Sequence, residues 1–114
     1  MRLPQTVSAI CFLLLARLPS ASAAEPVDFV RDVRPILSDK CFQCHGPDEN
    51  AREGDLRLDL ESAAREVLSP GKPAASELLK RVTSPDSDYR MPPLESKRTL
   101  SKTEIDILRR WIAD

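Results

Sequence analysis

Apolar side chains recur with a helical period in two well-separated parts of the chain. The first lies within residues 28–40, and its apolar face consists of Phe29, Val33, Ile36 and Leu37. Asp28 is a possible N-cap for this helix. Pro35 lies inside it and is expected to kink the helix or to restart it there, because its ring removes a backbone donor.

The second periodic stretch is at the C-terminal end and has the clearest start. Ser101 is a predicted N-cap and Glu104 stands three positions later, which together form a capping box. Leu100 and Ile105 flank the cap in the positions of a hydrophobic staple. The apolar face of this helix contains Ile105, Leu108 and Ile112, with Trp111 beside it.

Between these helices the pattern is weaker. Residues 46–57 predict a polar loop, and residues 56–60 alternate in a way that allows a short extended piece. Shorter helices are predicted at 61–67 and 74–82, the latter with Leu78, Leu79 and Val82 as its buried candidates. Residues 83–94 are rich in Pro, Ser and Asp, show no period and predict a loop.

The first 24 residues have the pattern of a secretory signal peptide. Arg2 supplies a positive charge, residues 7–15 form an apolar run, and residues 21–24 offer a small-residue cleavage site. The run is too short to span a bilayer. We therefore expect an exported, periplasmic or cell-envelope domain of residues 25–114, with no membrane span after the signal is removed. Cys11 would leave with the signal.

The candidate chemistry lies in residues 41–45, which read Cys-Phe-Gln-Cys-His. This spacing is typical of the covalent attachment of a c-type heme. Two thiols three positions apart, Cys41 and Cys44, can each form a thioether with one vinyl group of the same porphyrin. His45 then lies under the iron and can supply an axial imidazole nitrogen. The sequence predicts one heme c per chain.

Two other uses of these cysteines compete with heme. A zinc site needs about four ligands, whereas His45 is the only histidine in the chain. A disulfide between Cys41 and Cys44 is the stronger rival in an exported protein, and it would make the chain a heme-free interaction domain.

The second axial ligand can be sought by elimination. Met91 is the one methionine left after signal removal, and it stands in the predicted loop before the last helix. A thioether suits heme iron, and Pro92 and Pro93 would stiffen the chain just after it. The remaining options are Lys72, Tyr89 or an open site, and an open site would favour a heme enzyme or sensor.

Charge narrows the range of partners. Removing Arg2 and Arg17 with the signal leaves fifteen basic against eighteen acidic side chains, a formal net charge of −3. No basic stripe with interleaved aromatics is present, so a nucleic-acid partner is not expected. A basic cluster near the C-terminus forms either a docking patch or a solvated face, and it contains Lys97, Arg98, Lys102, Arg109 and Arg110.

Several segments together resemble the planctomycete-type cytochrome c domain. The resemblance covers about residues 28–113 and rests on residues 33–37, 41–48, 56–59, 70–79, 90–93 and 100–112. It implies an all-α, class I cytochrome c fold in which the first and last helices cross, with Phe29 and Val33 near Leu108 and Trp111.

The same resemblance implies thioethers at Cys41 and Cys44 and axial ligands from His45 and Met91. We therefore expect an electron carrier rather than an enzyme, with an unidentified redox protein as its partner. This module commonly stands at the N-terminus of longer proteins, so the chain is either a small cytochrome or the heme module of a larger protein.

Overall fold

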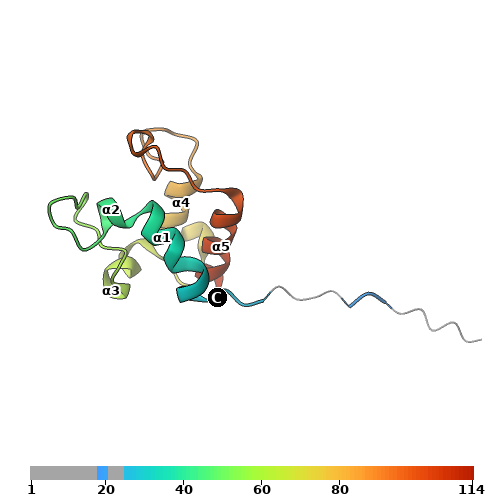
Figure 1. The fold of residues 1–114 in the computed structure, drawn as a ribbon. Coiled ribbons are helices and arrows are strands. Elements are labelled where there is room, and N and C mark those ends of the chain that lie inside the picture. The colour runs from blue at the N-terminus through green and yellow to red at the C-terminus, as the bar shows by residue number, and fades with distance from the viewer. Residues whose placement is uncertain (1–17, 21–24) are drawn as a thin grey trace, which may run out of the picture.

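The computed structural model describes residues 18–20 and 25–114, and these residues form helices and loops without a β-strand (Figure 1). The α-helices are α1 (Arg34–Lys40), α2 (Phe42–His45), α3 (Glu61–Ala64), α4 (Glu77–Thr83) and α5 (Lys102–Ala113). Four short turns of other helix types accompany them: η1 (Phe29–Val33), η2 (Arg65–Val67), η3 (Pro73–Ala75) and η4 (Leu94–Ser96). The all-α prediction is confirmed. The alternating residues 56–60 form a loop.

The predicted signal peptide lies outside the described residues, except for residues 18–20. Within the described part of the chain, none of the helices combines the length and apolar character that a membrane span requires.

Pro35 divides the first helical region, as its lack of a backbone donor predicts. Residues before it form the π-helical turn η1, in which the backbone N–H of Arg34 donates to the carbonyl of Phe29. The α-helical pattern begins only at Arg34, with Pro35 in the first turn of α1. The predicted N-cap is also present, because Asp28 Oδ1 accepts the backbone N–H of Arg31 at 2.7 Å.

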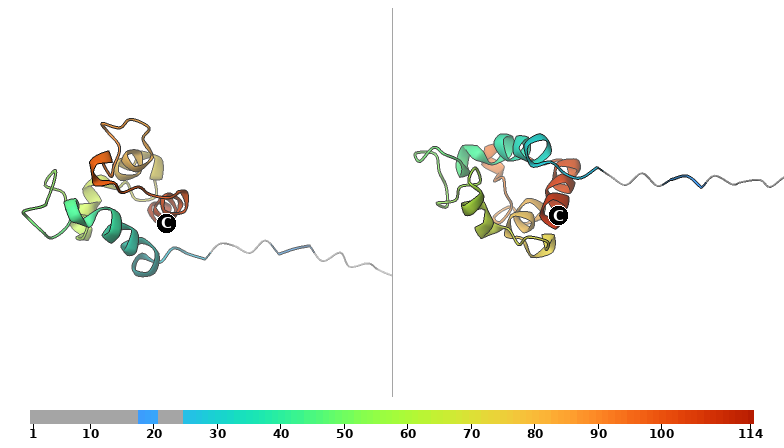
Figure 2. Two further views of the ribbon diagram at one scale, coloured as in Figure 1. Left: turned by 45° about the horizontal axis from the view of Figure 1, so that its top comes forward. Right: turned by 90° about the horizontal axis from the view of Figure 1, so that it is seen from below.

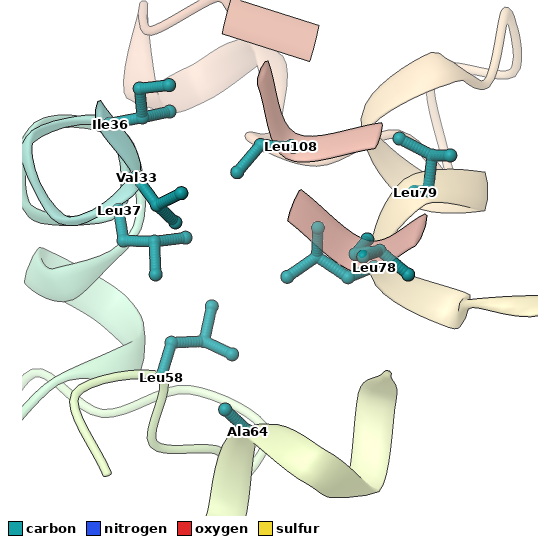
Figure 3. Packing of buried hydrophobic residues seen from close by; sticks show 9 residues of the cluster. Val33, Ile36, Leu37, Leu58, Ala64, Leu78, Leu79 and Leu108 are labelled. Atoms are coloured by element: carbon teal, nitrogen blue, oxygen red, sulfur yellow. The ribbon is translucent and has the colours of Figure 1, made fainter. Parts of the chain in front are cut away.

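The core lies where α1, α3, α4 and α5 surround a common centre (Figure 2). Nine apolar side chains are buried, and they come from these helices, from η1 and from the loop that holds Leu58 (Figure 3). They are Val33, Ile36, Leu37, Leu58, Ala64, Leu78, Leu79, Leu108 and Ile112. Most are aliphatic side chains of moderate size, so the protein alone builds a small core.

The first and last helical segments meet as the resemblance implied. Phe29 and Trp111 have ring centroids 5.6 Å apart with the planes tilted by 41°. Val33 and Leu108 are fully buried in the same core. Ser101 and Glu104 form the predicted capping box at the start of α5, through bonds of 3.0 and 3.1 Å.

The helix predicted over 74–82 begins later than its pattern indicated. Residues Pro73–Ala75 form a separate 3₁₀ turn, and α4 starts at Glu77. Ser76, between them, is fully buried, and its Oγ accepts the backbone N–H of Ser69 at 2.8 Å. That bond ties α4 to the preceding turn, in which Gly71 has a φ of 74° and donates to the carbonyl of Ile112.

Candidate heme site

The Cys-x-x-Cys-His segment begins where α1 ends. The backbone N–H of Cys41 donates to the carbonyl of Leu37 at 2.8 Å, which closes α1. The backbone N–H of His45 donates to the carbonyl of Cys41 at 2.8 Å. One helical turn therefore carries both thiols and the imidazole, and positions three and four apart share one face of it. Cys41 and Cys44 are free thiols.

Gly46 ends α2 at a point where a side chain would collide with the helix. A Cβ atom there would overlap the carbonyl oxygen of Phe42 and lie 3.0 Å from its carbonyl carbon. These are backbone atoms, and they cannot move aside in the way that the end of a long, flexible side chain can. Glycine thus allows the chain to leave α2 directly after His45.

The loop after His45 holds its ring in one orientation. His45 Nδ1 lies 3.0 Å from the carbonyl oxygen of Glu53. A carbonyl oxygen only accepts hydrogen bonds, so Nδ1 carries the proton and Nε2 keeps its lone pair for a metal. Two backbone bonds of 2.7 Å fix the loop to the motif: Glu53 donates to Cys44, and Leu58 donates to His45.

The structure brings together all four predicted site residues, although Met91 follows His45 by 46 positions. One cavity is lined by Cys41, Cys44, His45 and Met91, together with Lys40, Gln43, Val82, Pro92, Pro93, Ser96 and Arg98. The alternative ligands Lys72 and Tyr89 are not among its lining residues.

Met91 is held by contacts with α4. Its backbone N–H donates to the carbonyl of Arg81 at 3.1 Å. The Arg81 guanidinium lies 4.0 Å from the centre of the Tyr89 ring, and its Nη1 donates to the Tyr89 carbonyl at 3.4 Å. Glu77 Oε1 accepts both the Tyr89 hydroxyl, at 2.5 Å, and Arg81 Nε, at 3.1 Å.

We call Glu77, Arg81 and Tyr89 the α4 clamp. The Tyr89 hydroxyl, and after it Arg81, lowers the pKa of the Glu77 carboxyl. In return, Glu77 raises the pKa of the Tyr89 phenol. The clamp joins α4 to the loop two residues before Met91. The spacing of Glu77 and Arg81 is that of a helical ion pair, but nothing in the sequence pointed to Tyr89 as the third member.

Comparison with known families agrees with this arrangement. Residues 41–95 match the family model described as planctomycete cytochrome C. The chain carries a planctomycete cytochrome C domain. The match runs from the first motif cysteine to η4, so the resemblance expected over 28–113 is confirmed for 41–95. No curated protein and no solved structure matches the chain. Cytochrome c domains bind heme and carry electrons, and family membership indicates that function here.

The two thiols of the cytochrome domain are not equivalent. Burial, with a smaller contribution from the neighbouring Cys44, raises the pKa of the Cys41 thiol to about 12. A thiol with a pKa this high stays protonated at neutral pH in the protein without heme.

The donor set suits a covalently held heme: two thiols on one helical turn, an imidazole with a free Nε2, and a thioether on the opposite loop. The cavity between them is about 40 Å³, little more than the share of one water in the liquid. A macrocycle needs more room than this. The residues that would hold a heme therefore stand together, and a bound heme would also need space beyond this cavity.

Proposed function

We propose that this protein is an exported c-type cytochrome that transfers single electrons through one covalently attached heme. The observation that carries the proposal is the convergence of Cys41, Cys44, His45 and Met91 on one cavity from two distant parts of the chain. Export is supported by the signal-peptide pattern of residues 1–24, since heme attachment of this type takes place on the exported side of the membrane.

Cys41 and Cys44 hold the heme in this proposal. Each thiol would be joined to one vinyl group of the heme by addition of its S–H, a reaction that needs no external oxidant. Cys44 lies in α2 and Cys41 is the residue that precedes it, so that the two are three positions apart on one helical turn. Bound heme supplies an iron that cycles between the ferrous and ferric states.

His45 is the proximal ligand through Nε2. The Glu53 carbonyl holds the proton on Nδ1 and so fixes both the tautomer and the ring orientation. The polarised imidazole is a better electron donor to iron than a free one, because the carbonyl bond increases its basicity.

Met91 is the distal ligand through its thioether sulfur. Its backbone bond to Arg81 and the α4 clamp support a fixed position for the loop, which reduces the entropy lost when the sulfur binds iron. A soft thioether favours the ferrous state and raises the reduction potential. Two protein ligands, His45 and Met91, would leave a bound iron little access to small molecules, which suits a carrier rather than an enzyme.

Covalent attachment gives a direct test. Protein produced with its signal peptide and a heme maturation system should retain its heme through acid–acetone extraction and show the c-type pyridine hemochrome. The same protein with Cys41→Ser/Cys44→Ser is the control and should release any heme it binds. Extractable heme in the wild type, or none, would contradict the proposal.

A further inference from the structure

A second cavity lies directly beside the heme site, on the Met91 side. It is about 570 Å³ and runs between the end of α4, the Met91 loop and the first half of α5. We call it the cationic groove. Its lining residues are Val82, Thr83, Ser84, Arg90, Met91, Pro92, Arg98, Thr99, Leu100, Lys102, Ile105, Asp106 and Arg109.

The charge of the cationic groove is opposite to that of the domain. It contains four basic side chains, Arg90, Arg98, Lys102 and Arg109, against one carboxylate, Asp106. Among the described residues, ion pairs within 4.0 Å include Arg109 but none of the other three. Residues 25–114 nevertheless carry a formal net charge of −3. A positive groove on an acidic protein favours an anionic occupant.

The groove also has apolar lining residues. They are Leu100 and Ile105, which flank the start of α5, and Val82 of α4. Half-buried apolar side chains beside basic ones favour an occupant with both an apolar group and carboxylates. The basic cluster noted in the sequence therefore divides: Arg98, Lys102 and Arg109 line the groove, whereas Arg110 turns away and donates to the Glu25 carbonyl at 2.7 Å.

The groove also shares its wall with the heme site. Met91, Pro92, Val82 and Arg98 line both cavities. An occupant of the groove would lie against the loop that carries the proposed distal ligand, which is a short path for an electron.

We propose that the cationic groove is where an acidic, partly apolar segment of the redox partner docks. This inference rests on the proposed function, because it names the partner chemistry of that same site. Opposite charges would steer the encounter and raise the association rate, and the apolar lining residues would hold the docked segment. The attraction should weaken as salt shortens the range of the field to about 10 Å at 0.1 M ionic strength.

Binding is tested on the ferrous holoprotein by NMR titration with a short peptide that alternates Glu and Leu. Shifts should concentrate at the amides of Leu100 and Ile105. The variant Lys102→Glu/Arg109→Glu should weaken binding by about tenfold, since each exposed charge pair contributes up to about 1 kcal/mol. It spares the heme cavity, which neither residue lines.

The matched control is Arg34→Glu/Lys72→Glu, which makes the same charge change at two exposed positions outside the groove. Neither residue lines the groove, and the control should bind the peptide within about twofold of the wild type. A second peptide, with Gln in place of Glu, should bind much more weakly than the Glu peptide.

Electron transfer supplies a second readout. One electron leaves the ferrous protein and reduces hexacyanoferrate(III) to hexacyanoferrate(II). This rate should fall with increasing salt and fall about tenfold in Lys102→Glu/Arg109→Glu. The rate with the cationic oxidant tris(phenanthroline)cobalt(III) should stay the same or rise in that variant.

Failure of this inference can be told from failure of the proposed function. If the protein carries no redox-active covalent heme, the proposed function is wrong, whether or not the peptide binds. With such a heme present, the docking proposal is overturned if the groove variant and the control behave alike, or if the Gln peptide binds as well as the Glu peptide. Self-association at low salt that Lys102→Glu/Arg109→Glu abolishes would also overturn it, because the occupant would then be a second copy.

Discussion

The two sides of the candidate heme site are built in different ways. On the His45 side, the ligand, both thiols and the Glu53 carbonyl that orients the ring all come from residues 41–53. On the Met91 side, the position of the loop depends on α4, through the Arg81 carbonyl and the α4 clamp. The first arrangement is local and follows from one helical turn and the loop after it. The second also lies within a short stretch, residues 77–91, but it depends on side-chain bonds between α4 and the loop.

Both thiols and the imidazole lie within residues 41–45, whereas Met91 lies on a separate loop. We therefore expect covalent attachment of heme to depend on the His45 side and not on Met91.

The largest effect is expected from removing both attachment points. Cys41→Ala/Cys44→Ala should lack covalent heme and be largely unfolded or molten, because nine buried apolar residues form a small core and the cofactor's binding energy is part of the folding energy. The loss should approach the whole stability of a small domain, roughly 5 kcal/mol or more. Near-UV circular dichroism checks this, and a cooperative thermal transition without heme would argue for the heme-free interaction domain.

Removing the ligand on the other side should leave the heme attached. Met91→Ala should abolish the weak far-red band of a Met sulfur–ferric bond, lower the reduction potential and open the iron to carbon monoxide. The potential falls because a soft ligand that favours ferrous iron is lost. Absorption spectra and redox titration measure these changes. Rapid carbon monoxide binding by the wild type, unchanged in the variant, would favour the enzyme or sensor alternative.

A smaller effect on the His45 side is expected from Gly46→Ala. The added methyl group would overlap the Phe42 carbonyl, and α2 would have to distort at the residue next to His45. Forced crowding of this kind costs about 1–3 kcal/mol, measured as the free energy of unfolding of the holoprotein in denaturant. The control is Ala51→Gly in the following loop, because it removes one methyl group where Gly46→Ala adds one. Equal stability of Gly46→Ala and wild type would show that α2 accommodates the methyl group.

The smallest effect is expected from the α4 clamp. Tyr89→Phe removes the hydroxyl bond to Glu77 and leaves the ring beneath Arg81. Exogenous imidazole should displace Met91 with an affinity about twofold to fivefold higher, since exposed interactions contribute little individually. Arg57→Gln, which breaks the pair with Asp59 at 2.6 Å in the loop after His45, is the control and should leave imidazole affinity unchanged.

The clamp also predicts a pH dependence. The pKa of Glu77 is lowered in the folded protein by Tyr89 and Arg81, so its contribution to stability is present above the usual carboxyl pKa of 4.5. That contribution to stability is lost as the pH falls below about 4.5 and then through the lower pKa that Glu77 has in the folded protein. The far-red band should weaken over this range in the wild type, and Glu77→Gln should flatten that part of the titration. An unchanged acid profile in Glu77→Gln would show that other carboxyls account for it.

Local features were predictable from the sequence because their causes lie within a few residues. The Asp28 cap, the break at Pro35 and the capping box at Ser101 and Glu104 are confirmed, since each depends on side-chain to backbone bonds over three or four positions. The motif at 41–45 predicted the chemistry for the same reason, because covalent attachment needs two thiols and an imidazole at fixed local spacing.

Only the tertiary structure decided how distant segments meet. The start of α4 was predicted too early because Ser76 bonds back to Ser69, a contact that no propensity reports. The cavity that His45 and Met91 share and the groove beside it likewise depend on contacts between segments far apart in the sequence. Sequence patterns determine which residues can bind heme, since that is a matter of side-chain chemistry. Packing decides which of them face one another, because long-range contacts form only where the whole core allows them.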